Sequence, residues 1–307
     1  MKKTYVIFCL GIVFLATLQS ATAQIVKVDS LSNWKKAFKA GLNLNQASFS
    51  SNWKGGGVNS IGFNTLINFR ANYKKGVHSW DNEIDLLYGS INSEGQGYRK
   101  TNDRIYLDTK YGRALSSTWD LFTALNFQSQ FAKGYKYETN ALGVETESLI
   151  SAFLAPAFIT ATLGFEYHPA EYFKLRLAPL APRVTIVQNN DGRFAAVDPL
   201  KPYGVDVGET TRYEWLAFQM LADFNKDIAK NLNLKARYLM FANYETLELK
   251  TIDHRLDLNL TASVNRFINV SIGGILLYDY DQDLGAQISQ AFSLGAAYSF
   301  RNYEEKK

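Results

Sequence analysis

The sequence predicts an all-β protein: a transmembrane, antiparallel, up-and-down β-barrel of about 12 strands that follows an N-terminal signal peptide. Three observations predict this fold. About a dozen segments alternate apolar and polar residues, short and long connections alternate between them, and the chain begins with a secretory signal. Side chains on a strand alternate between its two faces, so each segment has one apolar face for lipid and one polar face for a lumen. Residues 61–73 illustrate this alternation.

Residues 1–23 have the features of a secretory signal peptide. Two lysines open the chain, residues 5–18 form an apolar run, and residues 21–23 read Ala-Thr-Ala, a small-residue cleavage site. The run is shorter than the roughly 20 apolar residues that a membrane-spanning helix needs. The single cysteine, Cys9, lies inside this run. We therefore expect the mature chain to begin at Gln24 and to contain no disulfide, thiolate metal site or cysteine nucleophile.

The composition favours strands and gives no support for a nucleic-acid partner. Aromatic residues make up 14% of the chain and prolines number six, a bias expected of β-strands. Loss of the two signal lysines lowers Lys plus Arg from 33 to 31 against 29 acidic residues, a net charge near +2. No linker-like shift interrupts the alternation. We expect one domain: a periplasmic lead-in at 24–36, an outer-membrane β-barrel at 37–300 and a short polar tail at 301–307.

The alternation predicts twelve strands. We expect them at 37–50, 58–74, 77–91, 103–115, 119–133, 150–167, 172–187, 211–226, 231–244, 250–264, 268–281 and 287–300. Pro179 and Pro182 interrupt the period of the seventh segment, because proline cannot donate a ladder hydrogen bond. Trp and Tyr recur near the segment ends, for example at Trp80 and Trp119, where barrels carry aromatic girdles.

The connections between these segments differ in length in a regular way. Short ones lie at 74–76, 116–118, 168–171, 226–230 and 265–267. Longer ones lie at 51–57, 92–102, 134–149, 188–210, 245–249 and 282–286. Outer-membrane barrels have short periplasmic turns and longer outward loops. The pattern predicts an outer-membrane location, with membrane lipid as a partner and both chain ends on the periplasmic side.

The last predicted strand carries a further signal. Within residues 293–300, Gly295, Tyr298 and Phe300 follow a polar residue at the spacing of the C-terminal signal that the barrel-assembly machinery recognises. Seven residues follow Phe300, which departs from the usual form of this signal. The machinery is thus a predicted partner, and an ordinary amphipathic strand is the alternative interpretation.

Three motifs in the N-terminal third carry a family resemblance. Residues 51–59 read Ser-Asn-Trp-Lys-Gly-Gly-Gly-Val-Asn, residues 80–82 read Trp-Asp-Asn, and Tyr88 precedes Gly89. With these motifs the chain resembles domain-of-unknown-function family 3078, uncharacterised outer-membrane proteins, over most of its mature length. The resemblance implies a Gram-negative outer-membrane barrel and implies no activity. The glycine run and Trp53 also fit simple loop chemistry at an outer interface.

The sequence offers no convincing catalytic, metal or cofactor site, and we predict that the protein is not an enzyme. By the predicted topology, two of its three histidines, His78 and His168, lie near the periplasmic rim and His254 lies near the outer rim, so the three cannot share a site across a barrel about 25 Å tall. His254 lies in an apolar row without a serine at a readable spacing. The segment 279–285 begins like a calcium loop but lacks the required glycine and glutamate.

Charged residues recur on the predicted lumen side of the strands. The candidate lumen-lining residues are Asp81, Glu83, Asp85, Arg104, Asp108, Lys110, Lys174, Arg176, Lys235, Arg237, Asp253, Arg255 and Asp257. In one interpretation they hydrate a pore and select the solute. In the other they pair across the lumen, plug it and stiffen the wall. A barrel of about 12 strands lies between the filled 8-stranded barrels and the porins with 16 to 18 strands, so both interpretations stay open.

These observations predict a class of function rather than a substrate. The first hypothesis is a porin-like or transport channel for a small polar or charged solute. The second is a closed structural or binding barrel that acts through its extracellular loops, chiefly 134–149 and 188–210. The third is an outer-leaflet lipid-modifying enzyme that would use His254, the histidine placed nearest the outer rim.

Overall fold

The computed structural model describes residues 33–50, 58–140, 143–265 and 268–302. One compact unit comprises Asn33–Arg301, and a second, Met1–Ser32 with Asn302–Lys307, lies almost wholly outside the described residues. The predicted signal peptide, most of the lead-in and most of the polar tail fall outside them as well. Among the described residues, no helix is both long enough and apolar enough to cross a bilayer.

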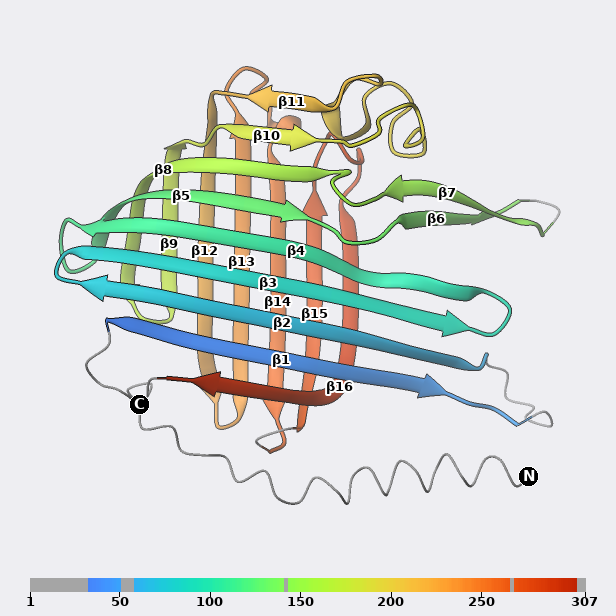
Figure 1. Ribbon diagram of the computed structural model, residues 1–307, viewed down its shortest axis with the longest axis horizontal. Coiled ribbons are helices and arrows are strands. Elements are labelled where there is room, and N and C mark those ends of the chain that lie inside the picture. Colours follow the sequence, from blue (N-terminus) through green and yellow to red (C-terminus); the bar gives the residue numbers. More distant parts are fainter. Residues whose placement is uncertain (1–32, 51–57, 141–142, 266–267, 303–307) are drawn as a thin grey trace. The chain divides into compact units, whose positions relative to one another are not determined.

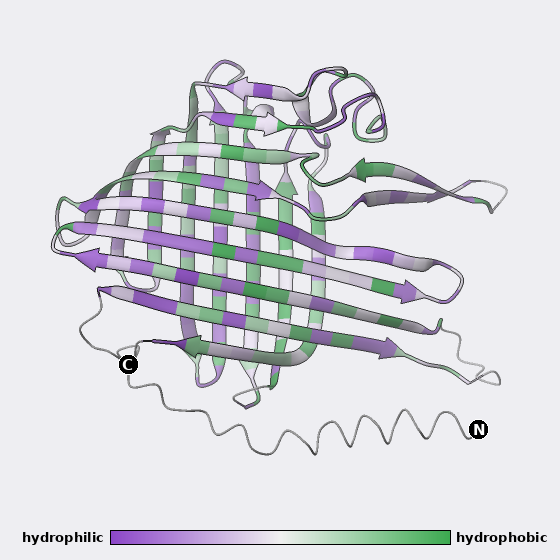
Figure 2. Cartoon of the chain, in the orientation of Figure 1, coloured by the Kyte–Doolittle hydropathy of each residue, from purple (hydrophilic) through white to green (hydrophobic). Residues whose placement is uncertain are grey.

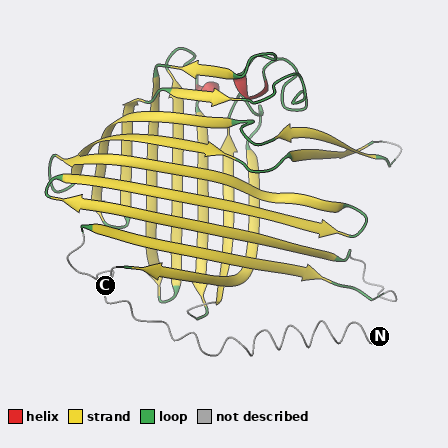
Figure 3. Ribbon diagram, in the orientation of Figure 1, coloured by secondary structure: helices red, strands yellow, loops and turns green. Residues whose placement is uncertain are grey.

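Strands make up most of the compact unit, and loops and turns most of the rest (Figure 3). Twelve of them follow the predicted segments: β1 (Trp34–Ala47), β2 (Ser60–Lys75), β3 (His78–Ser93), β4 (Gly97–Ala114), β5 (Trp119–Ser129), β8 (Ala157–Ala170), β9 (Phe173–Leu180), β12 (Ala217–Ala229), β13 (Leu232–Asn243), β14 (Asp253–Ser263), β15 (Ile268–Tyr278) and β16 (Gln287–Arg301). The remaining elements are β6 (Gly134–Thr139), β7 (Glu145–Ser151), β10 (Arg183–Ile186), β11 (Thr211–Glu214) and the short 3₁₀ helices η1 (Pro202–Gly204) and η2 (Leu249–Thr251).

The twelve strands form a closed antiparallel ring, which confirms the predicted fold class. Their order is β1-β2-β3-β4-β5-β8-β9-β12-β13-β14-β15-β16, and the ring closes because β16 pairs with β1. Each strand of the ring pairs with the next one along it, the arrangement of an up-and-down barrel (Figure 1). This order puts β3 opposite β13 and β4 opposite β14, six places apart in a ring of twelve.

Two predicted strands are each broken once. The seventh segment is divided into β9 and β10 at Ala181–Pro182, and the eighth into β11 and β12 at Trp215–Leu216. Pro182 has no N–H for the ladder, which explains the first break. Pairing resumes on both sides, because β10 pairs with β8 and β11 while β9 pairs with β8 and β12. The Ala181 N–H donates to the Ala217 carbonyl at 2.8 Å, which links the two breaks.

The barrel has a short-turn end and a long-loop end (Figure 1). The connections β2–β3, β4–β5, β8–β9, β12–β13 and β14–β15 lie at the short-turn end, and the others lie at the long-loop end. Two expected loops proved to be largely strand. Residues 134–149, expected as a loop, belong mostly to the hairpin β6–β7, and residues 92–102 mostly continue the hairpin β3–β4 through a tight turn with Gly95 and Gly97 at positive φ. These hairpins contain no apolar row, because they project beyond the barrel wall.

The loop 188–210 is itself folded. Phe194, Tyr203 and Val205 of the loop form a buried apolar cluster with Ala155 and Val187. The Tyr203 hydroxyl donates to the Ile150 carbonyl, and burial raises the pKa of this phenol. Gly204 has a φ of +74°, and a Cβ there would collide with the Arg212 guanidinium, so this close approach requires glycine.

The outer wall of the barrel is apolar, and polar and apolar residues alternate along its strands (Figure 2). Exposed outward side chains include Ile67, Trp80, Leu107, Leu125, Leu163, Leu258, Ile272 and Phe292. The inner wall is packed on one side by an apolar cluster comprising Phe122, Ala124, Ala178, Ala181, Ala217 and Phe241. The lumen is therefore filled unevenly around the ring.

Two lumen-facing glycines differ in the space around them. A Cβ on Gly164 of β8 would lie 2.1 Å from the Leu177 carbonyl oxygen, whereas a Cβ on Gly273 of β15 would meet nothing closer than 3.6 Å. We predict that Gly164→Ala lowers the free energy of unfolding by about 1–3 kcal/mol through backbone displacement. Gly273→Ala is the matched control and should leave it unchanged. Urea titration of the refolded barrel measures both, and equal midpoints for the two variants would contradict the packing described.

Candidate functional site: the lumen charge network

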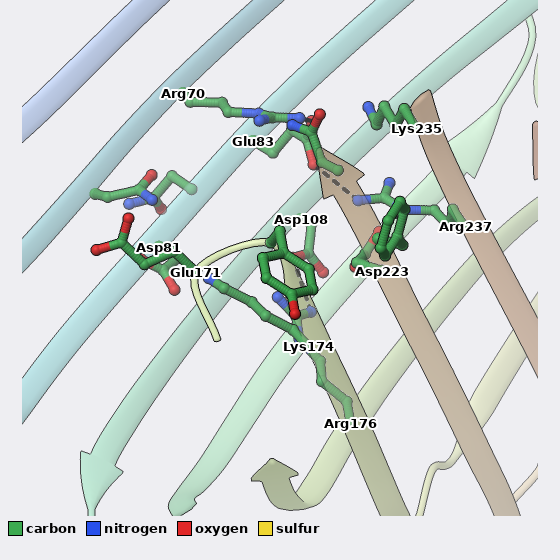
Figure 4. Close-up of a pocket in the computed structure, with 15 residues that line it drawn as sticks. Arg70, Asp81, Glu83, Asp108, Glu171, Lys174, Arg176, Asp223, Lys235 and Arg237 are labelled. Atoms are coloured by element: carbon green, nitrogen blue, oxygen red, sulfur yellow. Dashed lines mark hydrogen bonds and ion pairs between the residues drawn. The ribbon is translucent and has the colours of Figure 1, made fainter. Parts of the chain in front are cut away.

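The lumen charge network comprises the ion-paired side chains that point into the barrel. Its defining contacts join opposite walls. The Arg237 Nη2 of β13 lies 3.2 Å from the Glu83 Oε2 of β3 (Figure 4). The Arg104 Nη1 of β4 lies 3.7 Å from the Asp257 Oδ1 of β14. Since β3 and β13, and likewise β4 and β14, face each other across the ring, these pairs cross the interior.

Other ion pairs join strands that lie two or three places apart in the ring. The Arg176 Nη1 of β9 lies 3.1 Å from the Asp108 Oδ2 of β4, and the Arg183 Nη1 of β10 lies 3.0 Å from the Asp253 Oδ2 of β14. Lys110 of β4 donates to the Glu166 Oε1 of β8 at 2.6 Å, and these side chains are only 1% and 2% exposed. Such a desolvated pair is strongly destabilised when one partner is removed.

Every acidic residue predicted for the lumen has a cationic partner. Asp81 pairs with Lys110 at 3.1 Å, Asp85 with Arg104 at 2.9 Å, and Asp257 also with Arg255 at 2.7 Å. The acidic row on β3, expected to influence solute selection, is thus neutralised by its neighbours.

Three lumen lysines differ from the other cations. In the part of the chain that the structure describes, Lys39, Lys174 and Lys235 form neither an ion pair nor a side-chain hydrogen bond. Lys174 and Lys235 line the same cavity (Figure 4), and Lys39 lies on β1, four residues before Asn43 on the same face. These lysines are therefore the unpaired cations of the described lumen, whereas paired cations such as Arg237 are each shared by two carboxylates.

The structure brings together most of the predicted lumen residues. Those in ion pairs are Asp81, Glu83, Asp85, Arg104, Asp108, Lys110, Arg176, Arg237, Asp253, Arg255 and Asp257. The sequence interpretation did not single out four of their partners, namely Arg70, Glu166, Arg183 and Asp223. The sequence did contain a signal for two of these partners. Glu166 lies between the outward Phe165 and Tyr167, and Asp223 precedes the outward Phe224, so alternation places both carboxylates on the lumen side.

Aromatic rings reinforce the network on its packed side. The Arg183 guanidinium lies 3.2 Å from the Phe241 ring centre, and the Arg176 guanidinium lies 5.8 Å from that of Phe122. Cations over ring faces gain from the ring quadrupole, particularly where water is excluded. These contacts fill the lumen beside β5, β9 and β13.

The opposite side of the lumen has a different lining. Its inward residues on β15, β16 and β1 are mostly small or uncharged, including Ser271, Gly273, Ser289, Ala291, Ser293, Gly295, Ala297, Gly41 and Asn43. A Cβ on Gly41 would meet nothing closer than 3.7 Å. The inward side chains of the β15–β16–β1 wall are therefore mostly shorter than those of the charge network.

One cavity lies within the network and a second lies beyond it. One of about 190 Å³ lies toward the short-turn end and is lined by Arg70, Glu171, Lys174 and Lys235 among others (Figure 4). The other, of about 850 Å³, lies at the long-loop end between the loop 188–210 and residues 280–284. Arg212 of β11 pairs with Asp281 beside this second cavity and joins β11 to the loop 280–284.

The histidines and the acidic loop form no shared site. His78 contacts the Tyr111 hydroxyl at 2.6 Å, His168 contacts Asp120 at 3.2 Å, and His254 contacts the Tyr238 hydroxyl at 2.7 Å. Burial raises the pKa of the Asp279 carboxyl in the acidic loop. Within the described ranges, no group of three or more His, Cys, Asp or Glu side chains is arranged to hold a metal ion.

The residues of the predicted assembly signal lie on β16. Tyr298 and Phe300 point outward and are exposed, while Gly295 pairs with Asn43 of β1 on the lumen side. An assembly role for these residues stays a prediction.

The closed ring, apolar outer wall and charged interior define the class: an outer-membrane-type β-barrel. The model of a family described as protein of unknown function, DUF3078, matches residues 44–135, which confirms the predicted resemblance over that part of the chain. Among curated proteins, none matches the chain.

Solved outer-membrane barrels are similar to the chain at low sequence identity. The translocator domain of the autotransporter NalP from Neisseria meningitidis shares 8% identity at a TM-score of 0.39, covering 89% of this chain and 91% of its own. The NanC porin shares 7% sequence identity at a TM-score of 0.40, and the match covers 85% of this chain and 98% of the porin. An outer-membrane channel from Pseudomonas putida F1 shares 8% sequence identity at a TM-score of 0.38, and the match covers 87% of this chain and 94% of the channel.

Proposed function

We propose that this protein is an outer-membrane channel with a narrow lumen that passes a small anionic solute. One observation carries the proposal: the predicted lumen carboxylates are all paired, and Lys39, Lys174 and Lys235 supply unpaired positive charge in the described lumen. Charges along a pore wall set which ion enters, because the wall replaces part of its hydration shell.

An outer-membrane location is supported by the outer surface. Exposed apolar side chains cover the wall, and aromatic pairs such as Trp34–Tyr73 and Trp119–Tyr167 lie near the short-turn end. Barrels in this membrane carry such girdles at the lipid interface. In this proposal the short-turn end faces the periplasm and the long-loop end faces outward.

A narrow path is supported by the asymmetric filling of the lumen. The charge network joins opposite walls, and the apolar cluster fills the side near β5 and β9. The remaining route follows the small residues of β15, β16 and β1. We therefore expect a small conductance rather than that of a wide porin with 16 to 18 strands.

Ion selectivity in planar bilayers tests the proposal. With a potassium chloride gradient across the membrane, the reversal potential should report a preference for chloride. Exchanging Lys39, Lys174 and Lys235 together for glutamate should invert that preference, because it replaces the free positive charge with negative charge. Lys75→Glu, at the exposed end of β2 beside the β2–β3 turn, is the control and should leave it unchanged. Cation preference in the unaltered protein would refute the proposal.

A closed binding barrel is the second candidate, and the network itself favours it. Ion pairs between opposite walls stiffen a barrel, and the folded loop 188–210 offers a rigid outward surface. In this alternative the protein acts through the loops at the long-loop end. Absence of conductance from every folded preparation in the bilayer experiment would support it over the channel.

A further inference from the structure

The ring is closed along only part of one seam. β1 pairs with β16 from Ala37↔Arg301 to Asn43↔Gly295, and the pairing ends there. β1 continues to Ala47 but pairs only with β2 beyond this point, and Gln287–Leu294 of β16 pairs only with β15. In Figure 1, β16 runs beside β1 and then bends away toward β15.

The unpaired part of the seam has free backbone edges. Residues 44–47 of β1 and 287–294 of β16 have edge N–H and C=O groups that no ladder between these two strands pairs. Such groups are costly to leave unpaired in hydrocarbon, so membrane barrels are normally closed throughout. The part of this stretch within the bilayer therefore needs water from the lumen or a polar part of another molecule.

Exposure along β16 indicates an opening at this seam. The outward residues Ile288 and Phe292 are 80% and 69% exposed, and the inward residues Ser289 and Ala291 are exposed as well. On the fully paired strand β14, exposure of both faces is confined to two adjacent residues, Leu258 and Asn259, whereas on β16 it extends over the six residues 287–292. On β5, for comparison, the outward Leu125 is exposed whereas the inward Ala124 is buried.

We infer that the unpaired β1–β16 seam is a lateral port between the lumen and the outer leaflet, and that an amphiphile with an anionic head group and one apolar chain passes through it. Outside the seam, Leu44, Phe292 and Leu294 offer an apolar surface for the chain. Inside it, the lining is uncharged and small, and Lys39 follows about 13 Å along β1 from Asn43. The anionic head group rests on the proposed channel function, whereas the port itself rests on strand pairing.

Fluorescence quenching by lipid tests the port without reference to conductance. The single cysteine of the chain is Cys9, which the mature protein is expected to lack, so introduced cysteines can be labelled cleanly. A bimane on Ala291→Cys should be quenched by phospholipid with brominated chains. The inward Asn259→Cys of β14 should not be quenched, and the outward Leu258→Cys should be. Ala291→Cys behaving like Asn259→Cys would overturn the port.

Disulfide formation gives a second, independent readout. Extending the register places Asn45 opposite Ser293, whereas Gly41 pairs directly with Ala297, where a Cβ on Gly41 would lie 3.8 Å from the Ala297 Cβ. That separation suits a disulfide. Gly41→Cys/Ala297→Cys should therefore oxidise readily and Asn45→Cys/Ser293→Cys poorly. Complete oxidation of the second pair at the same rate would show a closed seam and overturn the port.

The identity of the passenger is tested with dodecyl phosphate as the probe. Dodecyl phosphate should slow the alkylation of Ala291→Cys by a water-soluble maleimide severalfold, and Lys39→Gln should weaken this protection. Dodecanol together with inorganic phosphate is the control and should not protect. Equal protection by dodecyl phosphate and by the control mixture would refute the inference that the passenger is an anionic amphiphile. If the unaltered protein conducts no chloride, the proposed channel function is refuted. The quenching experiment would still decide whether the lateral port exists.

Discussion

Replacing Glu166 with glutamine is expected to lower the free energy of unfolding of the barrel by about 3–5 kcal/mol. The Glu166 carboxylate accepts from the Lys110 Nζ at 2.6 Å and from the Arg176 Nε at 3.0 Å, and its side chain is 2% exposed. The amide removes the one negative charge that these two cations share. Lys110 keeps Asp81 and Arg176 keeps Asp108 as partners, but the two cations then lie close together in a desolvated site with one carboxylate fewer, where their repulsion is poorly screened.

Chemical denaturation of the refolded protein in lipid vesicles measures this effect. Glu138→Gln is the matched control, because Glu138 forms an exposed pair with Lys136 on the hairpin β6–β7 and exposed pairs contribute little. Adding Lys110→Met to Glu166→Gln should restore part of the lost stability, since it removes one of the two repelling cations. A Glu166→Gln midpoint equal to that of the control would show that the pair is hydrated rather than buried.

The alternation of residue types predicted the ring of strands well, because membrane strands must present one apolar face along their length. Residues 61–73 illustrate this: the segment is one strand, and its polar residues Asn64, Asn68 and Arg70 lie on one side of it. The same rule failed for residues 134–149. The hairpin β6–β7 projects past the wall, so Tyr135, Tyr137 and Glu147 need not follow an apolar row.

The partners across the lumen could not be predicted from the sequence. Alternation assigns Glu83 and Arg237 to the inner face, but it says nothing of which strands lie opposite each other. That depends on the strand number and on the stagger of the ring, which local patterns do not encode. These two residues are 154 positions apart and still form an ion pair. The interpretation with paired charges and the one with a hydrated pore therefore looked equivalent until the ring order was known.

Removing the main cross-lumen pair should widen the path. In Glu83→Ser/Arg237→Ser, the two side chains that join β3 to β13 are shortened together, and the net charge of the lumen is kept. We expect single-channel conductance to rise severalfold, with chloride preference retained, because Lys39, Lys174 and Lys235 are untouched. The second contacts of these residues, Arg70 with Glu83 and Asp223 with Arg237, are lost as well and free further side chains to move.

A charge-matched control separates widening of the lumen from a general effect of the substitutions. Lys136→Ser/Glu138→Ser removes one cation and one anion from the exposed hairpin β6–β7 and should leave conductance unchanged. A gel-shift assay on unboiled samples verifies that each variant is folded. If the folded Glu83→Ser/Arg237→Ser barrel conducts no better than the unaltered protein, the constriction lies elsewhere in the lumen. If only the double variant conducts, the ion pairs act as a plug, and a partner or solute that competes for Arg237 or Glu83 would be needed to open it.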